Sequence, residues 1–91
     1  MDLYAEITKK IIFAQKAILG PVAVSIASKT PGLDMHDTNH PSFSSDPKEV
    51  LVQLVKNYSE FFGDISIEVC KEAAHDALKQ GESIDLPDVL K

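Results

Sequence analysis

Residues 46–62 read DPKEVLVQLVKNYSEFF, and this stretch decides the fold. Asp46 suits a helix N-cap, Pro47 suits the first helical position, and Glu49 stands three residues after the cap. Apolar side chains then recur at helical spacing, at Val50, Leu51, Leu54, Val55, Tyr58, Phe61 and Phe62. The pattern predicts an amphipathic helix over 47–62, which we expect to lie at the centre of the core.

The segments on either side of this helix predict two more long helices. Residues 3–19 carry apolar side chains three and four residues apart, at Tyr4, Ile7, Ile11, Ala14 and Ile18. Gly20 and Pro21 then interrupt the pattern. Residues 65–80 are apolar on one side, at Ile67, Cys70, Ala73, Ala74, Ala77 and Leu78. We expect Gly63 to end the preceding helix in a left-handed conformation, with Asp64 or Ser66 as the next N-cap.

Residues 21–29 are ambiguous between a helix and a strand. Val22, Val24 and Ile26 alternate with smaller residues, as in a strand, but Val22 and Ile26 also share one face of a helix. Because no other segment has the pattern of a strand that would pair with this one, we predict a short helix. The strand alternative for 22–27 stays open at this point.

The remaining segments have no helical period. Residues 30–46 are rich in turn-forming residues and contain three apolar anchors, Leu33, Met35 and Phe43. The tail is apolar at Ile84, Leu86, Val89 and Leu90, so we expect it to dock on the bundle or on a partner. The predicted fold is all-α: a single domain, residues 1–91, with about four helices (3–19, 21–29, 47–62, 65–80), a long polar loop 30–46 and an apolar C-terminal tail.

Composition excludes several classes of function. The formal net charge is −5, and all nine basic residues are lysines. A chain without arginine lacks the side chain that binds phosphate in bidentate fashion, so we expect no nucleic-acid partner. No apolar run approaches the ~20 residues that span a membrane. The opening MDLYAEITKK is not a secretory signal, and we expect a cytoplasmic protein with no membrane partner.

The loop contains the one group of residues that resembles a metal site. Asp34, His36, Asp37 and His40 offer oxygen and nitrogen ligands of the kinds that zinc, nickel and iron accept. Proline, glycine and asparagine around them disfavour a preformed helical clamp, and binding would cost ordering entropy. The same residue types are common in turns, where their side chains bond to nearby backbone amides. We therefore favour a polar loop, with metal binding or a metal-dependent activity as the alternative.

We predict no catalytic residue and no cofactor. Cys70 lies among the apolar positions of its helix, where a free cysteine packs as a small hydrophobic side chain. His75 and Asp76 are neighbours on a helix and point about 100° apart, so the carboxylate does not orient the imidazole. We expect both on a solvent-exposed face.

These observations favour a non-catalytic protein-interaction or regulatory domain. A chain of 91 residues builds only a thin core, yet 44% of its residues are hydrophobic. Charge is also uneven, because residues 1–29 carry four lysines and the rest is strongly acidic. We expect a protein partner, and self-association into a homo-oligomer accounts for the apolar surplus.

Overall fold

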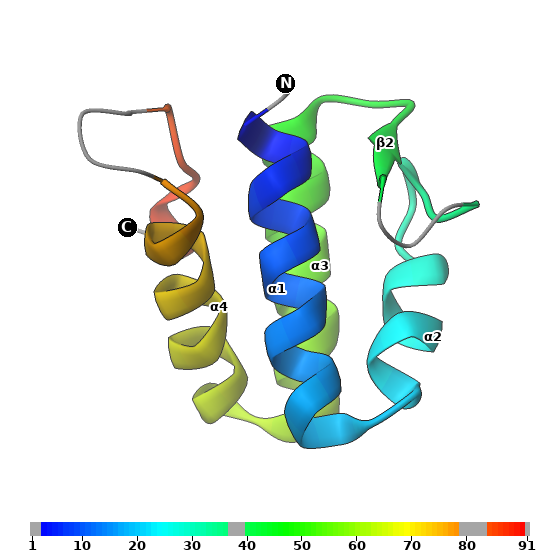
Figure 1. The fold of residues 1–91 in the computed structure, drawn as a ribbon, viewed down its shortest axis with the longest axis vertical. Helices are drawn as coiled ribbons and strands as arrows, with labels where there is room; N and C mark the ends of the chain where they lie inside the picture. Colours follow the sequence, from blue (N-terminus) through cyan, green and yellow to red (C-terminus); the bar gives the residue numbers. More distant parts are fainter. Residues whose placement is uncertain (1–2, 37–39, 79–83, 91) are drawn as a thin grey trace.

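The computed structural model describes residues 3–36, 40–78 and 84–90, and in them the chain is an all-α bundle (Figure 1). Its elements are α1 (Leu3–Leu19), α2 (Val22–Ser28), β1 (Leu33–Asp34), β2 (Ser42–Phe43), α3 (Pro47–Phe62), α4 (Asp64–Ala77) and a 3-10 turn, η1 (Asp88–Leu90). The four predicted helices are therefore confirmed. No helix in the described part of the chain is long and apolar enough to cross a membrane.

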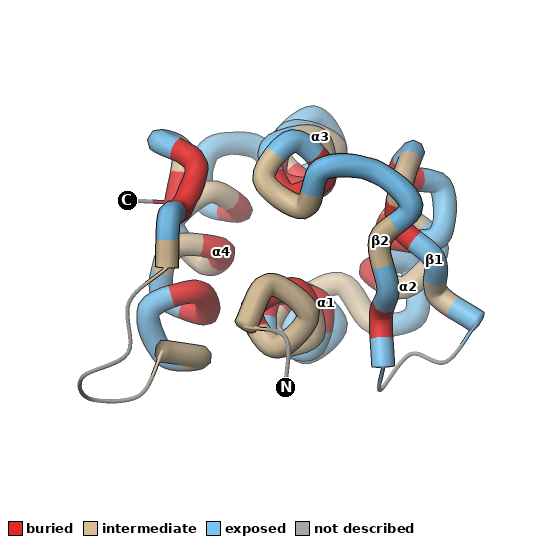
Figure 2. The backbone as a smooth tube through the Cα atoms, turned by 90° about the horizontal axis from the view of Figure 1, so that it is seen from above, coloured by how far each residue is buried: buried red, intermediate tan, exposed pale blue. Residues whose placement is uncertain are grey.

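α1 and α3 lie between the other two helices. α4 packs on one side of this pair and α2 on the other, with the β1–β2 ladder above α2 (Figures 1 and 2). The buried side chains form one cluster: Ile7, Ile11, Ile12, Ala23, Ala27, Leu33, Val50, Leu51, Leu54, Val55, Tyr58, Cys70, Ala73, Ala74, Leu86 and Leu90. Every helix, β1 and the tail contribute to it, so the described elements share a single hydrophobic core.

The start of α3 is built as the sequence predicts. The Asp46 carboxylate accepts a hydrogen bond from the Lys48 backbone amide at 3.3 Å, and Pro47 occupies the first helical position. Gly63 ends the helix at a φ of 84°, in the left-handed region that glycine adopts without strain. Both boundaries of α3 follow from local residue chemistry.

The ambiguous segment after Gly20 is a helix. α2 runs from Val22 to Ser28, and its Ala23 and Ala27 are fully buried. The Tyr58 hydroxyl of α3 donates a hydrogen bond to the Ala23 carbonyl at 2.7 Å. A small side chain at Ala23 lets α3 approach closely enough for this buried bond.

The loop has more regular structure than we predicted. β1 and β2 pair antiparallel, with Leu33 opposite Phe43, so the expectation that no segment forms a strand is wrong here. Gly32 is required beside the ladder, because a Cβ atom there would lie 2.9 Å from both Ser45 Cβ and Val50 Cγ2. Leu33 is buried, and Met35 and Phe43 pack partly buried against the core, as expected of anchors.

α4 differs from its prediction at both ends. The helix begins at Asp64, directly after Gly63, and neither Asp64 nor Ser66 acts as a side-chain cap. It ends at Ala77, because Leu78 turns to an extended conformation with a ψ of 117°. The predicted end at residue 80 lies outside the described residues.

The apolar tail docks on its own bundle, which was one of the two predicted outcomes. Leu86 and Leu90 are buried in the common core. The Tyr4 hydroxyl donates to the Asp85 carbonyl at 2.7 Å, and Lys48 Nζ lies 2.7 Å from Asp85 Oδ2. The tail thus joins the first turns of α1 and α3.

Candidate functional site

Two of the four loop residues form a local turn. The Asp34 carboxylate accepts a hydrogen bond from the His36 amide at 3.0 Å, and His36 Nε2 lies 3.7 Å from the same oxygen, Oδ1. The His36 side chain is 95% exposed. This is the arrangement by which an aspartate stabilises a turn two residues on.

In the described structure, the other two predicted metal ligands, Asp37 and His40, do not complete a site with Asp34 and His36. His40 is exposed and precedes β2, and Asp37 lies outside the described residues. Among residues 3–36, 40–78 and 84–90, no three His, Cys, Asp or Glu side chains are grouped so that they hold a metal ion. Metal binding by Asp34, His36, Asp37 and His40 stays a prediction. Calorimetric titration with zinc and nickel tests it, since a true site binds far more tightly than roughly millimolar.

Cys70 lies in a buried polar cluster between α1 and α4. Gln15 Nε2 donates to the Ser66 carbonyl at 3.1 Å and to Cys70 Sγ at 3.3 Å. Burial raises the pKa of the Cys70 thiol to about 11, and the hydrogen bond from Gln15 opposes part of this shift. A protonated, buried thiol is a poor nucleophile, so the predicted packing role of Cys70 fits its surroundings.

His75 and Asp76 lie on the solvent side of α4, as expected. His75 Nε2 is 3.2 Å from the Leu90 carbonyl oxygen, so the imidazole contacts the tail. Both residues border a hollow of about 890 Å³ between α1 and α4, which also has Lys10, Lys71 and Glu72 on its rim. Charges of both signs surround this hollow, and they select no class of ligand.

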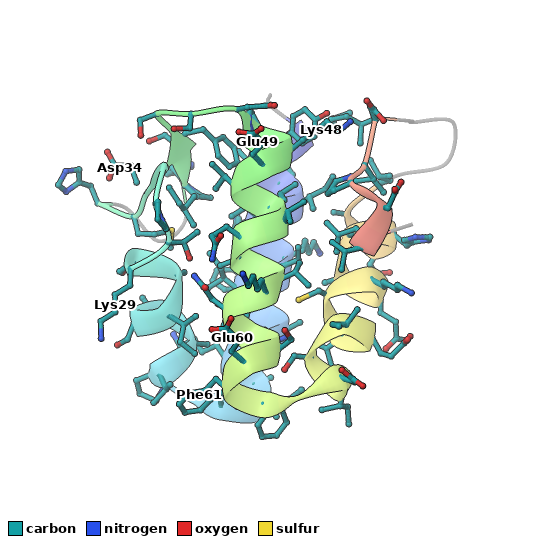
Figure 3. All side chains as sticks on the ribbon, turned by 180° about the vertical axis from the view of Figure 1, so that it is seen from behind. Lys29, Asp34, Lys48, Glu49, Glu60 and Phe61 are labelled. Carbon is teal, nitrogen blue, oxygen red and sulfur yellow. The ribbon has the colours of Figure 1, made fainter. Side chains whose placement is uncertain are left out.

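Most of the large apolar residues that are exposed in the described part of the chain lie elsewhere, at one end of the bundle. The α1–α2 turn and the α3–α4 turn both lie at the lower end in Figure 1. The large apolar side chains that are exposed beside these turns are Ile18, Val22, Phe61, Phe62 and Ile65, which we call the apolar end. Figure 3 shows Phe61 there, beside α2, and Phe61 borders a hollow together with Ile26 and Lys29.

Sequence reasoning missed the apolar end because periodicity assigned Ile18, Phe61 and Phe62 to the core. Phe61 and Phe62 continue the apolar stripe of α3, and Ile18 that of α1, but these three side chains are 42–60% exposed. The available signal was the run Phe61-Phe62-Gly63-Asp64-Ile65, which places large apolar residues on both sides of a helix-ending glycine. Side chains beside such a turn extend past the last buried layer, which here contains Tyr58.

No protein-family model, no curated protein and no solved structure matches this chain.

Proposed function

We propose that the chain is a non-catalytic protein-interaction or regulatory domain, located in the cytoplasm, which binds its partner through the apolar end. One observation carries the proposal. Five large apolar side chains, 39–60% exposed, surround two turns that lie at the same end of the bundle. Single exposed apolar residues are ordinary, but several large ones gathered at one end of a domain are typical of an interaction surface.

The aromatic content of the apolar end supports this proposal. Phe61 is 60% exposed and Phe62 is 42% exposed. Aromatic residues are enriched at the centres of protein interfaces, where they bury a large area with few rotatable bonds. A partner that covers both rings would gain the free energy of removing their apolar surface from water.

Affinity capture with matched variants tests the proposed function. The double variant Phe61→Ser/Ile65→Ser removes the two most exposed members of the apolar end, and Val52→Ser is the control because Val52 is 44% exposed but lies in the middle of α3. We expect the wild type and Val52→Ser to retain the same protein from a native cell lysate, a second copy of the chain included. Retention by the double variant as well, or by none of the three, would contradict the proposal.

A further inference from the structure

Opposite charges flank the two halves of the apolar end. Lys16 lies in the last turn of α1 and borders a hollow with Pro21 of the α1–α2 turn, on the α1–α2 half. Asp64 lies in the first turn of α4, beside Ile65 on the α3–α4 half. Both charged side chains belong to exposed residues. Each half therefore presents apolar groups next to a charge of one sign.

Lys16 and Asp64 have no ionic partner within the described part of the chain. The ion pairs there are His36–Asp34, Lys48–Asp85 and Lys71–Glu68, and they include neither Lys16 nor Asp64. By contrast Glu68, one turn after Asp64, has Lys71 at 4.0 Å. Lys16 and Asp64 are two of several exposed charges without an ionic partner in the described residues. Glu60, next to Phe61, is another and adds a second negative charge to the α3–α4 half.

We infer that the partner of the apolar end is a second copy of this chain, bound across a two-fold axis that runs along the boundary between the two halves. This inference rests on the proposed function. Such an axis places the α1–α2 half of one copy on the α3–α4 half of the other, and the contact is made twice. Lys16 of each copy then meets Asp64 of the other, and Ile18 and Val22 meet the aromatic side chains.

The dimensions of the apolar end indicate a weak dimer. The molecule measures 32 × 26 × 20 Å along its principal axes, and the apolar end lies at one end of the longest axis. The cross-section perpendicular to the longest axis measures at most 26 × 20 Å, which is smaller than the ~800 Å² per partner of a standard interface. The net charge of −5 on each copy opposes association further. We expect a dissociation constant of about 10–100 μM, which falls within the range of transient complexes.

Charge exchange tests the two-fold pairing. In Lys16→Glu the copies bring two carboxylates together at each contact, and in Asp64→Lys they bring two ammonium groups together. We expect either variant alone to dimerise roughly threefold to thirtyfold more weakly than the wild type. An equimolar mixture should form a heterodimer, because Glu at position 16 then meets Lys at position 64, and Asp64 meets Lys16. The helix dipole also favours both native charges, but it acts within each monomer and does not produce this recovery.

Sedimentation equilibrium of the full chain over a concentration series measures these effects. Phe61→Ser should abolish the dimer, whereas Val52→Ser and Glu72→Lys, which change an exposed apolar group and a charge away from the apolar end, should preserve it. Urea denaturation checks that every variant is folded. Failure of the mixture to associate, or a dimer that Phe61→Ser leaves intact, would overturn the inference. A monomeric wild type that still retains another protein through the apolar end would overturn the inference alone, and the proposed function would stand.

Discussion

Ser66 shows how a single buried hydroxyl limits stability. Ser66 is fully buried. Neither Ser66 Oγ nor Gln15 Oε1 has a hydrogen-bond partner in the described residues. A buried polar group without a partner costs ~1–3 kcal/mol. The two hydrogen bonds from Gln15 Nε2 hold α1 in a defined orientation against α4. The two unpaired oxygen atoms of the same cluster lower the free energy of unfolding.

Replacing Ser66 with alanine should stabilise the protein. The substitution removes the unpaired hydroxyl and leaves the Ser66 backbone carbonyl, which accepts from Gln15, in place. We expect the free energy of unfolding to rise by about 0.5–2 kcal/mol, measured by urea denaturation. Gln15→Ala is the contrasting variant, because it also removes two donated bonds and should destabilise. A loss of stability in Ser66→Ala would show that the hydroxyl is bonded in solution.

Ionisation of the Cys70 thiol should lower the stability of the fold at alkaline pH. The thiol has an ordinary pKa of 9.0, and burial raises it to about 11 in the folded chain. Between these two values the unfolded chain loses the proton while the folded chain retains it, so stability falls as the pH rises. The thiol makes its full contribution to the free energy of unfolding below pH 9, and this contribution is lost by about pH 11. A pKa shift of this size corresponds to about 2–3 kcal/mol.

Urea denaturation at several pH values between 8 and 11 measures this loss, with Cys70→Ala as the reference. Burial also raises the pKa of Tyr58, so both proteins should weaken at high pH. The wild type should weaken more steeply than the variant above pH 9. Parallel curves for the two proteins would show that the thiol ionises equally readily in the folded and unfolded chain.

α3 contains both fully buried core residues and a side-chain N-cap. We therefore expect the loss of stability in its variants to follow burial first and capping second. Leu54 is fully buried in the middle of the helix, and Leu54→Ala should cost ~2–5 kcal/mol in the free energy of unfolding. Asp46→Ala removes the cap bond to the Lys48 amide and should cost less, ~0.5–2 kcal/mol. Replacing His36 and His40 together should change stability by less than about 0.5 kcal/mol, because both are exposed. Urea denaturation ranks the three, and a histidine effect as large as that of Leu54→Ala would show that the two histidine side chains themselves stabilise the fold.

Element boundaries were predictable where local chemistry sets them. Asp46 and Pro47 begin α3, and Gly63 ends it, through interactions with residues at most four positions away. The β1–β2 ladder escaped prediction because it joins Leu33 to Phe43 through strands of only two residues, which are too short to show alternation. The prediction of Ser66 as an alternative N-cap was also wrong. Ser66 is buried against Gln15 of α1, a residue distant in sequence, and the sequence alone does not reveal this contact.

The candidate site was less predictable than the fold. Helical periodicity identifies the side of a helix on which Phe61 lies, but burial depends on whether a neighbouring helix reaches that level. Phe61 and Phe62 are the last two residues of α3, and they stay 60% and 42% exposed although α4 begins two residues later, at Asp64. The apolar end combines residues of four helices around two turns, and no single stretch of sequence contains it.

At the scale of the whole molecule, the two ends of the bundle differ in character. At one end the tail covers apolar groups, and Asp85 joins Tyr4 of α1 to Lys48 of α3. The hydrogen bond to Asp85 raises the pKa of Lys48, as expected for an ammonium group held beside a carboxylate. At the opposite end, where the two turns lie (Figure 1), large apolar side chains are exposed, among them Phe61 (Figure 3). The tail thus covers part of the apolar surface within the chain, whereas the apolar end stays exposed in the described structure.

Leu90→Ala tests whether these two ends act independently. Leu90 is fully buried at the end of the tail, so its truncation should lower the free energy of unfolding by ~2–5 kcal/mol. Val89→Ala is the matched control, because Val89 is only partly buried and should cost less. Urea denaturation at one low protein concentration keeps association from contributing to the comparison. Since Leu90 lies away from the apolar end, sedimentation of the folded variant should give a dissociation constant within about twofold of the wild type. A folded Leu90→Ala chain that no longer dimerises would instead show that docking of the tail controls the apolar end.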